Sequence, residues 1–107
     1  MKKCYLSGAI AHYDIDERRA AFKVASVTVK GMGMKPVNPF DNGLPQSADW
    51  PKHMRVDMGM LLQCDYIYML DGWWLSKEAK LELDVASSCG ITPIFQTECN
   101  QLNEERL

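Results

Sequence analysis

CDYIYML, at residues 64–70, is the clearest β-strand in the sequence. Its nearly continuous apolar run is typical of a strand that is buried on both faces, as the central strands of parallel sheets are. Turn residues follow at 71–74, and a helical pattern then runs from Ser76, which can cap it, to about Ser88. A strand that leads through a short turn into a helix is typical of a β-α-β unit, so this stretch predicts a parallel sheet.

The rest of the chain continues the alternation on both sides of this stretch. Polar loop residues fill positions 40–50, and the other predicted elements are strands at 4–6, 34–37 and 91–95 and helices at 14–30 and 51–63. The order β-α-β-loop-α-β-α-β predicts an α/β fold: a small Rossmann-like or flavodoxin-like three-layer sandwich with a four- to five-stranded parallel sheet. A short terminal helix is one interpretation of the polar tail from Thr97.

Size and composition narrow the class of protein. A chain of 107 residues predicts one domain, residues 1–107, and its limited depth favours a pocket built between subunits of a homodimer or higher homo-oligomer. A net charge of −2 gives no reason to expect a nucleic acid polymer or a membrane as partner. Met1-Lys2-Lys3 leads into a strand that is too short for a signal-peptide core, so we expect a cytoplasmic protein. The cysteines lack metal-site spacing and are interpreted as reduced structural residues: Cys4, Cys64, Cys89 and Cys99.

Two acidic residues fall on faces of predicted helices that are otherwise apolar. Glu82 lies near the middle of an apolar arc that a helical wheel assigns to Ala79, Leu81, Leu83, Val85, Ala86 and Cys89. Asp57 shares the apolar stripe of the preceding helix with Met54, Met58, Leu61 and Leu62. Burying an unpaired carboxylate is costly, so such residues are paired or functional. A salt bridge from Glu82, or a helix rotated to bring it to an edge, is the structural alternative.

Open α/β sheets bind ligands outside the carboxyl ends of their strands. The residues that directly follow predicted strands are therefore candidates: Ser7-Gly8, Asn38 to Asp41, and Asp71 to Trp74. Paired carboxylates at this edge suit glycosyl transfer, in which one attacks the anomeric carbon and the other handles protons or hydroxyls. Trp73 either stacks on a nucleobase or covers the sheet edge or a dimer interface.

These residues together resemble a known family. Tyr5-Leu6-Ser7-Gly8-Ala9-Ile10 resembles the strand and turn that open the nucleoside 2-deoxyribosyltransferases and the related deoxynucleoside 5′-monophosphate N-glycosidases. Asp57, eight residues before Asp65, resembles their middle motif, and the helix containing Glu82 resembles the one that carries their nucleophile. Gly72-Trp73 and Asn38-Pro39 resemble features of short bacterial and phage relatives. The resemblance extends from about Tyr5 to Phe95.

The resemblance implies an enzyme that cleaves or transfers the N-glycosidic bond of a nucleoside or nucleotide without a cofactor or metal. Glu82 would attack C1′, Asp57 would bind sugar hydroxyls or assist protonation of the leaving base, and Tyr5 would orient Glu82. Further substrate-binding candidates are Ser7, Gly8, Asn38, Asp41, Gly72, Trp73 and Ser76. Composite sites across a dimer are also implied.

Two departures from the family pattern bear on the substrate. Glu78 stands where the N-glycosidases have a glycine near the 5′-phosphate, and Ala11-His12-Tyr13 stands where they have an arginine. A carboxylate at that helix start repels a phosphate, so the substrate is expected to lack one. These departures also favour a second hypothesis, an inactive module that binds or senses a nucleotide-derived ligand. A third, a TIR-like NAD-cleaving domain, is disfavoured by the short loops.

Overall fold

The computed structural model describes residues 1–97, so Cys99 and the predicted terminal helix beyond Thr97 lie outside the described residues. The elements follow the predicted order: β1 (Lys3–Ser7), α1 (Ile15–Gly31), β2 (Lys35–Val37), η1 (Pro39–Asp41), α2 (Trp50–Leu61), β3 (Tyr66–Met69), η2 (Trp73–Leu75), α3 (Lys77–Ser88) and β4 (Thr92–Phe95). The loop at 40–50 differs in one respect, because its start belongs to η1. There the Asn38 side chain accepts a hydrogen bond from the Phe40 amide at 3.0 Å and caps this short 3-10 helix.

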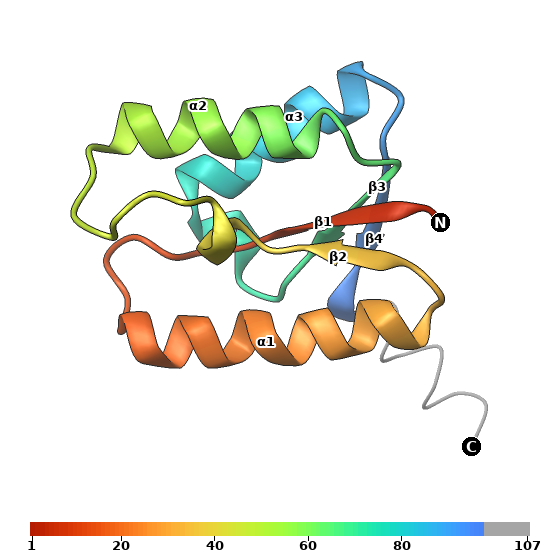
Figure 1. Cartoon of the computed structure of the whole chain (residues 1–107), viewed down its shortest axis with the longest axis horizontal. Helices are drawn as coiled ribbons and strands as arrows, with labels where there is room; N and C mark the ends of the chain where they lie inside the picture. Colours follow the sequence, from red (N-terminus) through yellow and green to blue (C-terminus); the bar gives the residue numbers. More distant parts are fainter. Residues whose placement is uncertain (98–107) are drawn as a thin grey trace.

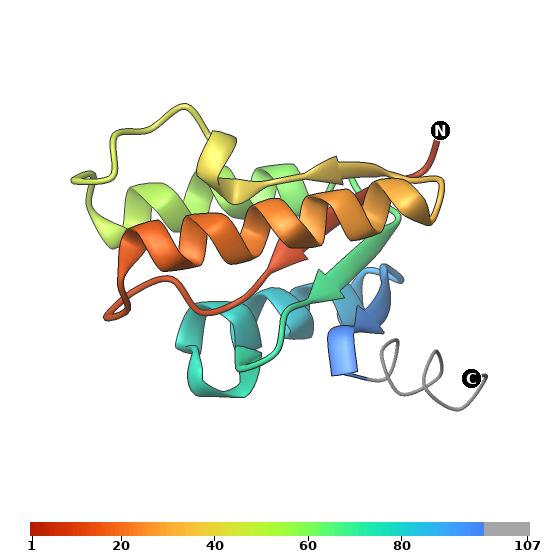
Figure 2. The ribbon, with the colours of Figure 1, turned by 90° about the horizontal axis from the view of Figure 1, so that it is seen from below.

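The sheet has four parallel strands in the order β2-β1-β3-β4. β1 and β3 are the two inner strands, and their register pairs Tyr5 with Ile67 and Ser7 with Met69. Helix α1 covers one face, and α2 and α3 cover the other (Figures 1 and 2). The predicted three-layer sandwich and the central position of the strand within residues 64–70 are thus confirmed.

The core is divided by the sheet into two clusters. The cluster under α1 contains Cys4, Leu6, Phe22, Ala25, Val29, Tyr68 and Leu70. The cluster under α2 and α3 contains Tyr5, Leu61, Cys64, Ile67, Met69, Ala79, Ala86 and Ile91. Successive strand residues point to opposite faces, so Cys4 and Leu6 face α1 whereas Tyr5 and Ser7 face α3. This alternation places two hydroxyl groups beneath the helix that carries Glu82.

Three residues assigned to inward helix faces are instead exposed. Leu62 directly follows α2 and Cys89 directly follows α3, so neither side chain belongs to the packed face of its helix. Leu81 is 37% exposed because the buried stripe of α3 is narrower than the helical wheel indicated, with Ala79, Glu82 and Ala86 as its members. The cysteines Cys4, Cys64 and Cys89 are free thiols. Within residues 1–97, no helix combines the length and apolar character that crossing a membrane requires.

Gly8 offers a test of the packing at the end of β1. A Cβ at this position would lie 3.0 Å from the Leu70 Cβ and 3.3 Å from the Phe22 Cζ. Gly8→Ala is therefore expected to lower the free energy of unfolding by about 1–3 kcal/mol, the usual cost of overpacking. Gly59→Ala is the control, because a Cβ there meets nothing within 4 Å and alanine favours a helix by up to about 1 kcal/mol over glycine. Urea denaturation measures both, and a Gly8→Ala protein as stable as the parent would contradict this packing.

Candidate active site

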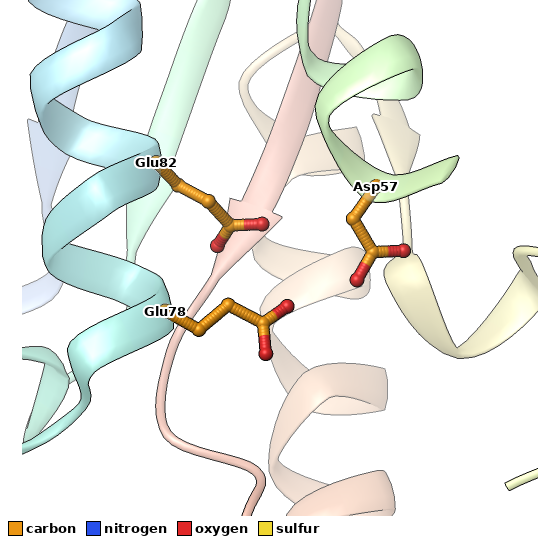
Figure 3. Close-up of side chains that lie close together, drawn as sticks. All are labelled: Asp57, Glu78 and Glu82. Atoms are coloured by element: carbon orange, nitrogen blue, oxygen red, sulfur yellow. The ribbon is translucent and has the colours of Figure 1, made fainter. Parts of the chain in front are cut away.

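Three carboxylates converge between α2 and α3. Asp57 comes from α2 and Glu78 and Glu82 from α3, and one carboxylate oxygen from each lies within 4.8 Å of the others (Figure 3). Asp57 is 3% exposed and Glu82 2%, which confirms that both side chains point inward. Glu78 was not among the predicted site residues. It precedes Glu82 by four residues and so lies on the same helix face, and this spacing is the signal that points to it.

The carboxylate of Glu82 is held by two hydroxyl groups from β1. The Tyr5 hydroxyl donates to Oε2 at 2.5 Å, and the Ser7 hydroxyl donates to Oε1 at 2.7 Å. The pKa of Glu82 is raised to about 7, because burial and, to a smaller extent, the charge of Asp57 raise it by more than these two hydrogen bonds lower it. Burial, followed by the charge of Glu82, also raises the pKa of Tyr5 well above its usual value, so Tyr5 remains a donor. Both oxygens of Glu82 are therefore fixed at the carboxyl end of an inner strand.

Asp57 is held by the residue that directly follows η1. The Asn42 amide nitrogen donates to the Asp57 Oδ1 at 2.8 Å and lies 3.0 Å from the His53 Nδ1. The Nε2 of His53 is buried and has no hydrogen-bond partner among residues 1–97. Asp41, the residue singled out from the sequence, is exposed, so the structure brings its neighbour Asn42 to the cluster instead.

Glu78 shares a hydrogen bond with Asp57. Burial first, and then the charge of Glu82 and the contact with Asp57, together raise the pKa of Glu78 to about 8. No basic side chain offsets the three carboxyl groups, since the ion pairs found in residues 1–97 are Lys2 with Asp65 and Arg18 with Glu17. The cluster therefore holds bound protons near neutral pH.

A pocket of about 210 Å³ opens onto this cluster. Asp57 and Glu78 form its acidic wall, whereas Glu82 lies behind them and does not line it. The remaining lining residues are Ile10, Ala11, Pro39, Phe40, Asn42, Leu44, Gln46, Ala48, Trp50 and His53. The lining contains no lysine or arginine, so the pocket favours ligands that are neutral or donate hydrogen bonds.

The other predicted substrate-binding residues take different positions. Gly72 directly precedes η2, and Trp73 packs against Phe95 with ring centroids 5.7 Å apart. Both aromatic residues line a second hollow, which none of the three clustered carboxylates lines. The Ser76 hydroxyl caps α3 by accepting a hydrogen bond from the Ala79 amide at 3.1 Å. Gly8 packs against the core, and Asn38 caps η1. Of the seven candidates, Ser7 is the one that hydrogen-bonds to the carboxylate cluster.

The chemistry available to the cluster is that of carboxyl groups. All-oxygen sets are the kind that hard divalent cations prefer. In this cluster, however, hydrogen-bond donors already occupy both oxygens of Glu82 and one oxygen of Asp57. This pattern suits an oriented nucleophile beside a proton-carrying group better than a cation site.

The raised pKa of Glu78 predicts how the stability of the protein depends on pH. The pKa of Glu78 is raised from 4.5 in the unfolded chain to about 8 in the folded protein. The protonated side chain therefore contributes to the free energy of unfolding in full below pH 4.5, and this contribution is lost as the pH rises through about 8. Glu78→Gln cannot ionise and is expected to lose less stability than the parent between about pH 5 and about pH 9. Urea denaturation at both pH values measures this. Asp84→Asn, an exposed change on the same helix, should follow the parent, and identical pH dependence in Glu78→Gln would contradict the shift.

The fold is shared with solved structures of known enzymes. A 2-deoxyribosyltransferase from Bacillus psychrosaccharolyticus matches with a TM-score of 0.66 and 16% identity, over 87% of this chain and 70% of that one. A CMP N-glycosidase from Clostridium botulinum matches with a TM-score of 0.62 and 17% identity, over 88% of this chain and 70% of that one. A 2-deoxyribosyltransferase from Leishmania mexicana matches with a TM-score of 0.64 and 23% identity, over 89% of this chain and 63% of that one.

No curated protein matches the sequence significantly. A family model described as "Domain of unknown function (DUF4406)" matches residues 2–95, which is most of the chain. The resemblance stated from the sequence is thereby confirmed at the level of the fold. The chain belongs to the family described as a domain of unknown function (DUF4406), and its fold is nucleoside 2-deoxyribosyltransferase-like.

Proposed function

We propose that this protein cleaves or transfers the N-glycosidic bond of a nucleoside, with Glu82 as the nucleophile. One observation carries the proposal. The Glu82 carboxylate is 2% exposed, and donors from β1 hold both of its oxygens at the edge where parallel sheets bind ligands. The structural neighbours include enzymes of glycosyl transfer and cleavage, which supports this reaction class.

The geometry supports a reaction through a covalent intermediate. In retaining glycosidases the two carboxyl groups lie about 5–5.5 Å apart, close enough for one to attack the anomeric carbon directly. One oxygen of each of Asp57, Glu78 and Glu82 lies within 4.8 Å of the others, which is closer to this spacing than to the wider one of inverting enzymes. In the proposed reaction Glu82 bonds to C1′ through an oxocarbenium-like transition state, and Asp57 binds sugar hydroxyls. Water or a second base then releases the sugar.

The proposed reaction requires Glu82 to become accessible from the pocket, and a local movement of Glu78 would suffice. Glu78 and Glu82 extend from neighbouring turns of α3 toward Asp57 (Figure 3), and of the two it is Glu78 that lines the pocket. A rotation of the Glu78 side chain would open Glu82 to the pocket while leaving α3 in place, and a bound sugar would supply the hydroxyl groups that replace the lost hydrogen bond to Asp57. Phe40 and Trp50 line the same pocket and are suited to contact the base. We further propose that a second copy of the chain encloses the ligand, since Trp50 is 43% exposed.

Release of free base tests the proposal. Incubation with a panel of 2-deoxynucleosides, analysed by chromatography, should show base release by the parent. Glu82→Gln keeps the size and one acceptor but has no nucleophilic carboxylate, so it should lower kcat by about 10³-fold or more, as loss of a catalytic nucleophile does. Base release by Glu82→Gln at the parent rate would remove Glu82 from this role. Asp84→Asn is the matched control on the exposed face of α3.

The charge of the pocket predicts which substrates are accepted. Asp57 and Glu78 line the pocket without any lysine or arginine, and they repel a second negative charge. A 2-deoxynucleoside should therefore react with a kcat/KM at least about tenfold higher than its 5′-monophosphate, which corresponds to about 1.4 kcal/mol. Competition between the two in one incubation measures the ratio. Preference for the monophosphate would show that another part of the molecule supplies a cation.

A binding or sensing module is the second candidate function. The observation that favours it is the burial of Glu82 behind the pocket wall. In that case calorimetry would show binding of a nucleoside that the protein leaves intact. Binding with turnover supports the enzyme instead.

A further inference from the structure

Building on the proposed function, we propose that Glu78 is the general acid of this site and delivers a proton to the departing base. This role deepens the assignment of Glu82 as nucleophile and is separate from it. It concerns the residue that stands where the resembling N-glycosidases carry a glycine. Three features of the site support this role: the carboxyl oxygens that already have donors, the position of Glu78 in the pocket, and the charges around it.

The hydrogen bonds indicate where the proton lies. Oxygens of Glu78 and Asp57 lie within 4.8 Å of one another, and two ionised carboxylates cannot share a hydrogen bond, so their contact favours a proton on one of them. Asp57 already accepts from the Asn42 amide. Glu78 has no other hydrogen-bond partner within residues 1–97. The proton is therefore assigned to Glu78, which no donor from another element holds, and Asp57 is the acceptor beside it.

The neighbouring side chains fix Asp57 as the acceptor. The Asn42 amide has two hydrogens, and its nitrogen lies within 3.0 Å of both the Asp57 Oδ1 and the His53 Nδ1. If it donates to both, His53 accepts at Nδ1 and carries its own hydrogen on the buried, unpartnered Nε2. Asp57 and His53 are thereby tied to the segment after η1. Glu78 is the member of the cluster whose side chain remains free to follow a ligand.

Position and charge both suit Glu78 for proton delivery. Glu78 lines the pocket, whereas Glu82 lies behind it, so a base held in the pocket meets the Glu78 carboxyl. The groups that face Glu78 are Asp57 and His53 of α2, Glu82 of α3 and Tyr5 of β1. Burial first, and then the charge of Glu82, raises the pKa of Glu78 to about 8. A carboxyl group that remains protonated near neutral pH is what a general acid requires.

The step conserves atoms and electrons. As Glu82 forms its bond to C1′, the C1′–N bond breaks and its electron pair goes to the base nitrogen. Glu78 donates its proton to the base, which leaves in neutral form, and Glu78 becomes a carboxylate. In the second half, Glu78 takes a proton from the water or base that attacks C1′, and the bond between C1′ and Glu82 breaks. Both residues then regain their starting states.

The test compares two leaving groups. A 2-deoxynucleoside needs protonation of its base, whereas 4-nitrophenyl 2-deoxyriboside releases a stable phenolate without it. Glu78→Gln should lower kcat on the nucleoside by about 10²–10⁴-fold but change kcat on the nitrophenyl compound by no more than about tenfold. It should also remove the alkaline limb from the pH profile of the nucleoside reaction. Glu82→Gln should lose both reactions and Asp84→Asn neither, with EDTA present throughout to exclude a bound cation.

The outcomes separate the two proposals. Equal losses on both substrates, or an unchanged nucleoside reaction in Glu78→Gln, overturn the role of Glu78 and leave Glu82 as nucleophile. A parent that acts on neither substrate overturns the proposed function. In that event, NMR titration of protein labelled with ¹³C at the glutamate carboxyl still locates the proton. A resonance titrating near pH 8 that persists in Glu78→Gln would assign the proton to another residue.

Discussion

The buried carboxylate of Glu82 is the constraint around which this small sheet is arranged. A carboxylate taken out of water must find donors, and here they come from the strand beneath it. Tyr5 and Ser7 are two residues apart on β1 and so share a face, and each donates to a different oxygen of Glu82. Moving β1 by one residue would turn both hydroxyls toward α1. The register of an inner strand and the position of Glu82 are therefore coupled.

The packing of α3 follows from the same contact. Ala79 and Ala86, on either side of Glu82 in the buried stripe, are both fully buried and small, so the helix can approach the sheet closely. The Ser76 cap fixes where this helix begins. Glu78 and Asp57 then enter the same space from two helices, and a shared proton relieves the repulsion that three charges would create. Stability and proposed chemistry thus depend on the same few groups, because loss of the carboxyl proton costs stability at high pH, and its retention supplies an acid at neutral pH.

The sequence predicted most of the fold and part of the site. The apolar run around β3 and the Ser76 cap are local signals, and an acidic residue on an apolar helix face identifies Glu82 and Asp57. Asn42 was not predicted as a site residue. Its approach to Asp57 depends on the turn that η1 makes, and such a turn leaves no periodic pattern in the sequence. For Trp73 the sequence left two roles open, stacking on a nucleobase or covering the sheet edge or an interface, and the structure packs its ring beside Phe95. Glu78 was noted for its charge alone, although its spacing from Glu82 already placed both on one face.

Trapping of the glycosyl-enzyme tests the central claim most directly. A nucleoside that carries a 2-fluoro-2-deoxyarabinosyl sugar slows release of the covalent intermediate, because fluorine destabilises the oxocarbenium-like transition state of that step. Peptide mass spectrometry after acid quenching should then find the sugar attached to the peptide that contains Glu82, at the Glu82 side chain. Base release with no adduct, or an adduct on a different residue, would contradict the account.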